Sequence, residues 1–147
     1  MRPILLTTLS SLLTVTTARI VGFATPETVA PDSTVKLEII AQNDIQAAQD
    51  VAFSFGLSPA ANAHPGTLGT LLSSKFLGPD LSNVVENITH YVHVPATTKK
   101  GKYVLSGAQF SLFGVSTSPT LVNYVANVTV GDSTSATYVD STLVTTQ

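Results

Sequence analysis

The sequence has 147 residues, with seven Lys and Arg against nine Asp and Glu, which gives a formal net charge of −2. This balance argues against nucleic acid or an anionic membrane surface as a partner. The chain has no cysteine, which excludes disulfide bonds, a thiolate metal site and a thiol nucleophile.

The first eighteen residues have the pattern of a secretory signal peptide. Arg2 precedes an apolar, charge-free run from Ile4 to Val15, and Thr16 and Ala18 supply small residues before the cleavage site. The apolar run is shorter than the roughly 20 residues that span a bilayer. We therefore predict cleavage between Ala18 and Arg19, and a secreted product with no membrane-inserted segment.

The remaining chain is long enough for one domain. Alternation of apolar and polar residues predicts strands over residues 20–24, 35–39, 51–57, 88–94, 101–112 and 122–130. Six to seven strands at this spacing predict an all-β, immunoglobulin-like antiparallel β-sandwich. We expect it to span residues 19–131, followed by a Ser- and Thr-rich tail, 132–147, with one edge strand around Tyr138.

The phase of the alternation predicts which side chains face the core. In the strand at 51–57, Asp50 and Ala52 fall on the face opposite the apolar residues. In the strand at 101–112 the apolar phase changes by one residue at Ser106 and Gly107, which predicts a β-bulge there. The expected core residues include Leu37, Phe53, Phe55, Tyr103, Phe110, Tyr124 and Val128.

A long connection between strands, residues 58–82, is the candidate partner-binding segment. Apolar residues in it recur at i, i+3, i+4 and i+8, which fits a short helix and a short edge strand equally. Connections longer than about 12–15 residues are usually functional or disordered. The candidate partner-binding residues are Leu68, Leu72, Phe76 and Leu77.

No arrangement of residues indicates catalysis. His90 and His93 lie three apart on a strand, so they point to opposite faces, and His90 is expected to be a hydrogen-bonded core residue. The sequence has no nucleophile elbow, no readable pair of carboxylates and no phosphate-binding glycine loop. We therefore expect no enzymatic activity, no cofactor and no metal site.

Two sequons, Asn87-Ile88-Thr89 and Asn127-Val128-Thr129, predict N-glycosylation at Asn87 and Asn127. In both strands the asparagine falls on the phase opposite the core. The aromatic residues free to be exposed are Tyr91, Phe113 and Phe76. A secreted cell-wall or carbohydrate-binding module without a host target is therefore an alternative function, although no row of exposed Trp or Tyr supports it.

Short blocks of sequence resemble the necrosis-inducing secreted effectors of plant-associated fungi. The blocks cover most of the chain after the signal peptide and lie at residues 18–24, 28–31, 66–69, 76–79, 94–95, 101–105, 111–114 and 127–131. They include no catalytic motif.

The resemblance implies a secreted effector that suppresses plant immunity. It implies binding and inhibition of host receptor-like kinases and of their cytoplasmic partner kinases, in the host apoplast or the host cell, and induction of cell death. It also links activity to the C-terminal region, which would begin here at about Tyr124.

Overall fold

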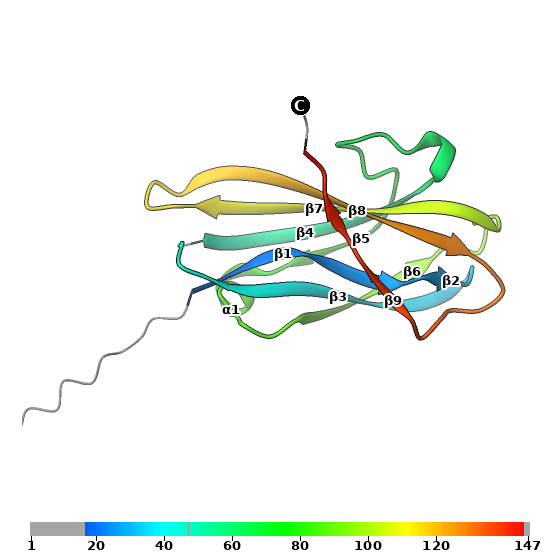
Figure 1. The fold of residues 1–147 in the computed structure, drawn as a ribbon, viewed down its shortest axis with the longest axis horizontal. Coiled ribbons are helices and arrows are strands. Elements are labelled where there is room, and N and C mark those ends of the chain that lie inside the picture. Colours follow the sequence, from blue (N-terminus) through cyan, green and yellow to red (C-terminus); the bar gives the residue numbers. More distant parts are fainter. Residues whose placement is uncertain (1–16, 47, 146–147) are drawn as a thin grey trace, which may run out of the picture.

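The computed structural model describes residues 17–46 and 48–145 (Figure 1). Most of the predicted signal peptide, residues 1–16, lies outside the described residues. The strands are β1 (Thr17–Pro26), β2 (Thr28–Val29), β3 (Ser33–Asp44), β4 (Ala48–Pro59), β5 (Thr70–Phe76), β6 (Ile88–Val94), β7 (Gly101–Phe113), β8 (Ser118–Val130), β9 (Tyr138–Asp140) and β10 (Thr142–Leu143). Two single-turn helices, η1 (Ala60–Asn62) and α1 (Gly78–Leu81), interrupt them.

The strands form two sheets that pack face to face, which confirms the predicted all-β sandwich (Figure 1). Sheet A has the order β6-β3-β1-β9, and sheet B has the order β10-β8-β7-β4-β5. The short β2 pairs parallel with β8, and the other pairs are antiparallel. The two layers bury the apolar face of each strand between them.

Four aromatic rings fill the centre of the core. Phe23 meets Phe55 edge-on with centroids 5.3 Å apart, and Phe53 stacks on Phe55 at 4.8 Å. Tyr124 stacks on Phe53 at 6.0 Å. Among the residues predicted to be in the core, those found buried are Leu37, Phe53, Phe55, Tyr124 and Val128, whereas Tyr103 and Phe110 are only half-buried.

The prediction of a β-bulge at Ser106 and Gly107 is wrong. The register of β7 continues unbroken through this point with both neighbouring strands, and the inward positions run on from Gly107 to Gln109, both buried. A Cβ on Gly107 would lie 2.5 Å from a ring carbon of Phe53, so glycine makes room for that ring. Because small and polar residues face inward here, the outward Phe110 looked like a core residue in the sequence.

The long connection 58–82 contains an edge strand, not a helix, at its apolar positions. β5 pairs with β4 at the edge of sheet B, and α1 follows it. In the tail, β9 pairs with β1 of sheet A, and β10 pairs with β8 of sheet B. The tail therefore crosses from one sheet to the other (Figure 1).

Candidate functional site

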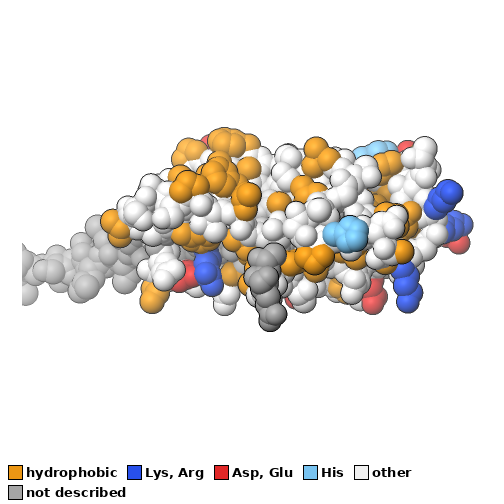
Figure 2. Space-filling view, turned by 90° about the horizontal axis from the view of Figure 1, so that it is seen from above, with side chains coloured by type: hydrophobic (Ala, Val, Ile, Leu, Met, Phe, Trp, Pro, Cys, Tyr) orange, Lys and Arg blue, Asp and Glu red, His pale blue; other side chains and the backbone are white. Residues whose placement is uncertain are grey.

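The outer face of sheet B carries an apolar row across four strands. Backbone pairing places Phe76 of β5 opposite Ala52 of β4, Ala52 opposite Phe110 of β7, and Phe110 opposite Leu121 of β8. Phe76 is 72% exposed and Leu121 is 71% exposed, while the two central residues are half-buried. We call these four residues the apolar patch. Figure 2 shows hydrophobic side chains gathered towards one end of this face.

The rest of this face is partly covered by the loop that precedes β5. A Cβ on Gly56 of β4 would lie 2.1 Å from the carbonyl oxygen of Leu68, so glycine allows the loop to cross the strand there. Ser106, opposite Gly56 in the ladder, is buried. The apolar patch therefore occupies the half of the sheet nearest the β7–β8 hairpin.

The strand segments around the patch carry few charges. On β5, Lys75 precedes Phe76, but it pairs with the inward-facing Phe53 and so lies on the opposite side of the strand. The segments 51–59, 103–113 and 118–130 contain no Asp, Glu, Lys or Arg. The outer face of sheet A differs, because it carries an ion pair between Lys36 and Glu38 at 2.9 Å. The two faces of the sandwich thus differ in character, and the uncharged segments around the patch suit contact with an apolar protein surface.

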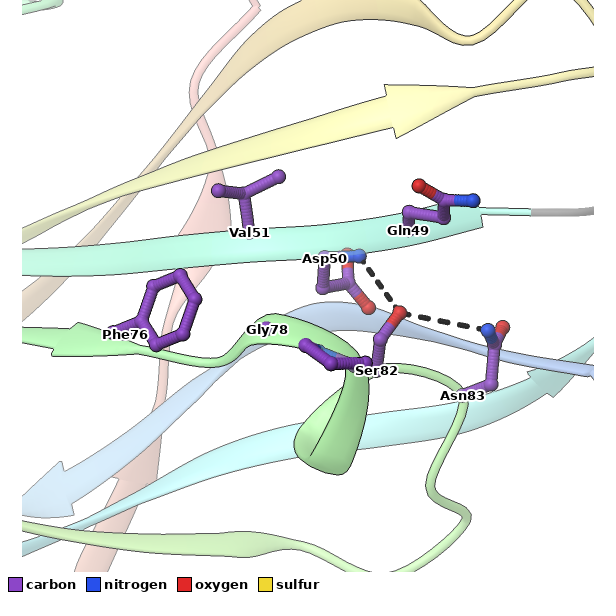
Figure 3. Close-up of a pocket in the computed structure, with 8 residues that line it drawn as sticks. Gln49, Asp50, Val51, Phe76, Gly78, Ser82 and Asn83 are labelled. Carbon is purple, nitrogen blue, oxygen red and sulfur yellow. Dashed lines mark hydrogen bonds between the residues drawn. The ribbon is translucent and has the colours of Figure 1, made fainter.

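A cavity of about 400 Å³ opens beside the patch, between the start of β4 and helix α1 (Figure 3). Its apolar lining comes from Val51, Phe76 and Pro79, and its polar lining from Gln49, Asp50, Ser82 and Asn83. Gly78, with φ of 55°, also lines it. A Cβ there would lie 2.6 Å from the ring of Phe76, so the glycine allows the ring to pack on the backbone.

Asp50 is a buried carboxylate, only 2% exposed. Its Oδ1 accepts hydrogen bonds from Ser111 Oγ at 2.6 Å and from Gln109 Nε2 at 2.8 Å. Gln109 Oε1 in turn accepts a bond from the Tyr124 hydroxyl at 3.1 Å. In the described part of the chain no basic side chain forms an ion pair with Asp50.

Three further observations identify the hydrogen-bond donors around Asp50. Burial raises the pKa of the Tyr124 hydroxyl, so it stays protonated and donates at neutral pH. The amide of Gln109 also donates to Ser111 Oγ at 2.8 Å. The Asp50 N–H donates to Ser82 Oγ at 2.9 Å, which connects the strand to the segment after α1 (Figure 3).

A β-bulge explains why Asp50 is buried. The register of β4 against β7 shifts between Asp50 and Ala52, so Val51 is the extra residue. Without the shift, the alternation that buries Phe53 would turn Asp50 outward, as the sequence predicted. A bulge redirects side chains on one side of it, and here it turns the carboxylate towards Gln109. The predicted outward position of Asp50 is therefore wrong.

The predicted partner-binding residues separate into different environments. Phe76 is exposed and belongs to the apolar patch, whereas Leu77 is 2% exposed and lies in the core. Leu72 is half-buried and packs against the core. Leu68 is half-buried over Gly56. The structure thus leaves Phe76 as the member of this set with a large exposed side chain, and it adds Leu121, which the sequence reading missed.

Both sequons lie on the outside of the sandwich. The predicted cleavage position lies near the start of β1. Asn87 and Asn127 are exposed. Asn87 precedes β6, and its Oδ1 accepts a hydrogen bond from the Ala41 N–H at 3.3 Å. Ala18 is buried within β1, and Arg19 is exposed and pairs with Asp44 at 2.6 Å.

The three histidines lie apart. His90 is half-buried, whereas His64 and His93 are exposed. Among the residues that the structure describes, no group of three His, Asp or Glu side chains could hold a metal ion. None of the helices in this part of the chain has the length and apolar character needed to cross a bilayer.

The aromatic residues considered for carbohydrate binding do not form one platform. Phe76 is on the outer face of sheet B, and Tyr91, 59% exposed, is on edge strand β6 of sheet A. Phe113 is half-buried at the end of β7. These positions give no row of rings along one surface.

Comparisons with a family model and with individual proteins point to the same family. The sequence model of the Nis1 family matches residues 16–129. A necrosis-inducing secreted protein 1 of Colletotrichum orbiculare is 46% identical over 132 residues, covering 90% of this chain and 82% of its own. That of Colletotrichum higginsianum is 48% identical over 132 residues, covering 90% and 92%.

A solved structure, a superoxide reductase (neelaredoxin) from Ignicoccus hospitalis, is similar with a TM-score of 0.43 and 14% identity, over 79% of this chain and 82% of that one. The names of the two fungal relatives refer to secretion and necrosis, and the protein is likewise secreted. From the family match and the identities over nine-tenths of its length, the chain belongs to the Nis1 family of necrosis-inducing secreted proteins.

Proposed function

We propose that the protein is a secreted effector that binds and inhibits plant immune receptor kinases and their cytoplasmic partner kinases, and that it induces cell death in host tissue. The class of partner comes from the resemblance to fungal effectors. The names of the two Colletotrichum relatives, which refer to secretion and necrosis, support the cell-death part of the proposal. The effector acts by stoichiometric binding, without turnover of a substrate.

The observation that carries the binding surface is the apolar patch. Large exposed apolar residues grouped on one face mark interaction sites in soluble proteins. Phe76 and Leu121 are the exposed ends of the row, and buried aromatic and apolar anchors dominate the affinity of interfaces. A stable complex needs about 800 Å² from each partner, so the contact would extend from the patch over neighbouring uncharged strand residues.

The test compares Phe76→Ser and Leu121→Lys with Tyr91→Ser, an exposed aromatic on sheet A. Co-precipitation with purified receptor-kinase domains should fall for the first two variants and not for the third. At increasing effector concentration, the first two variants should inhibit kinase activity less than the intact protein does, and the third should inhibit it as strongly. Normal kinase activity at a saturating dose of the intact protein would overturn the proposal. Equal binding by all three variants would place the contact on another surface.

The C-terminal region is the rival location, and truncation is a poor test of it. Removing the chain after Gly131 would delete β9 and β10, which pair with both sheets. Replacing residues 66–79 would similarly delete β5 and the buried Leu77. Leu143→Ser is better, because Leu143 is 56% exposed on β10. Loss of kinase binding in this variant alone would assign the surface to the C-terminal strands.

A further inference from the structure

The cavity beside the apolar patch has a buried anionic residue in its lining. The two strong donors of the network, Ser111 and Gln109, both bond to Oδ1 of Asp50. Within the described residues, no hydrogen bond joins the second oxygen, Oδ2, to a donor. Figure 3 shows Asp50 on β4 beside Ser82, and both belong to the lining of the cavity. Within the part of the chain that the structure describes, Oδ1 thus has two donors and Oδ2 has none.

A buried carboxylate without a cation is costly. Removing an ionised group from water is unfavourable unless a counter-charge and hydrogen bonds replace the water. The chain supplies hydrogen bonds from Gln109 and Ser111 but no basic partner among its described residues. A cation that enters from outside would complete the set.

The walls of the cavity suit a long side chain with a charged end. Val51, Phe76 and Pro79 provide apolar contacts for a methylene stem. The ring of Phe76 can also face a cation, which adds a favourable cation–π interaction. A volume of about 400 Å³ is at the small end of ligand pockets, which favours one side chain over a larger ligand.

We propose that this cavity accepts a lysine or arginine side chain of the partner protein, with its charged end on Asp50 Oδ2 and its stem against Phe76. The inference rests on the proposed function, because the partner that docks on the apolar patch would supply the side chain. Patch and cavity share Phe76, so one partner surface can occupy both. The patch provides the apolar contact, and the cavity selects for a basic residue next to it.

The pocket can be tested without a kinase. Amide chemical shifts of the isotope-labelled mature protein are followed while acetyl-Gly-Arg-Gly-amide or acetyl-Gly-Lys-Gly-amide is added. The control peptide carries citrulline, which has the shape of arginine and no charge. We expect saturable shifts of the Asp50, Ser82 and Asn83 amides with at least one basic peptide and none with citrulline. Equal shifts with all three peptides, or no shift, would overturn the proposal that the cavity binds a basic side chain.

Two variants test the role of the Asp50 charge, and the second of them does not alter a buried residue. Asp50→Asn keeps the side-chain shape and removes the charge, and should weaken peptide binding by about ten-fold or more. Its control is Asp80→Asn, which removes an exposed charge from α1 outside the cavity. Gln49→Arg alters only an exposed position at the cavity. It should fill the pocket from within the chain, abolish peptide binding and raise the unfolding temperature.

The same variants separate the pocket from the proposed function. If basic peptides bind the intact protein but kinase domains do not, the proposal of a pocket for a basic side chain stands and the kinase proposal is rejected. Kinase binding that is unchanged in Gln49→Arg and in a folded Asp50→Asn would reject the pocket's role in docking and retain the kinase proposal. Loss of both peptide and kinase binding in Gln49→Arg, with Asp80→Asn unaffected, supports both.

Discussion

His90 on β6 and Ser73 on β5 join the two sheets at their edges through a hydrogen bond of 2.9 Å between the imidazole Nε2 and the serine Oγ. β6 is the edge of sheet A and β5 is the edge of sheet B. The imidazole also stacks on Phe55 of the core, with ring centroids 5.6 Å apart. The expected hydrogen-bonded histidine is therefore found at a junction between the layers.

This junction makes stability depend on pH. Burial, and secondarily the charge of Lys75, lower the pKa of His90 below its usual value. The unfolded chain therefore binds this proton more readily than the folded one, and the free energy of unfolding should fall as pH decreases below about 6.5. Urea unfolding at pH 7.5 and pH 5 should show a smaller pH dependence in His90→Gln than in the natural protein.

The control for His90 is His93→Gln, an exposed histidine on the same strand that lies 3.3 Å from Asp32. It should leave most of the pH dependence in place. An identical pH dependence in the natural protein and in His90→Gln would show that protonation of His90 does not oppose folding.

The aromatic core supports a large effect for Phe53→Ala. Phe53 is completely buried and contacts three other rings. Truncating such a residue costs about 3–5 kcal/mol through lost burial and the cavity left behind. Denaturant unfolding should report this loss, whereas the exposed Phe76→Ala should change stability by no more than about 0.5 kcal/mol. Comparable losses for the two variants would contradict the described core.

The buried network predicts a cost for Gln109→Leu. The change leaves the Tyr124 hydroxyl without its acceptor and removes one donor from Asp50. Leaving buried polar groups unsatisfied costs about 1–3 kcal/mol, and more for charged groups. Gln42→Leu, at an exposed position on β3, is the matched substitution and should be nearly neutral. A stable Gln109→Leu protein would mean that the network does not constrain Asp50.

Glycosylation is expected at Asn87 or Asn127, because both side chains are exposed. Enzymatic removal of N-glycans should increase the gel mobility of protein from a glycosylating host. Asn87→Gln and Asn127→Gln should each remove their part of the shift, and no shift at all would mean that both sequons are unused. A glycan on Asn127 would lie about 20 Å along β8 from Leu121, so it would leave the apolar patch accessible.

The exported protein should begin at Arg19. Cleavage there removes Thr17 and Ala18 from β1 but keeps the pairing of Arg19 with Gln42 and the ion pair with Asp44. Terminal sequencing of secreted protein should therefore read Arg-Ile-Val-Gly. A product that begins before residue 18 would show that the β1 strand is kept whole.

The alternation of residues was enough to predict the main strands, because a two-residue period follows directly from strand geometry. Val35, Leu37 and Ile39 are buried as their spacing indicates. The same rule failed at Asp50, where a bulge changes the phase. A bulge between two long-range strands leaves no local mark in the sequence, so the orientation of Asp50 depends on tertiary contacts.

The candidate site was only partly predictable for a related reason. Phe76 was recognised from the length of its connection, but its grouping with Phe110 and Leu121 depends on the register of four strands. Register is set by pairing over long sequence separations, which a single sequence does not reveal. Because Phe110 was predicted to face the core, the alternation placed its neighbour Gln109 on the outer face, and the structure reverses both.

The tail that crosses between the sheets has a consequence for how the protein is made. The Phe23 N–H donates to Ser141 Oγ across 118 residues of chain, and β9 pairs with β1. Pairings of such long range are formed slowly in small β proteins, and the last strands leave the ribosome after all the others. β9 and β10 can therefore complete the two sheets only after β1 and β8 have been made. During export, the sequons at Asn87 and Asn127 emerge before the tail that joins the sheets, so the glycosylation enzyme meets them while both sheets still lack these strands.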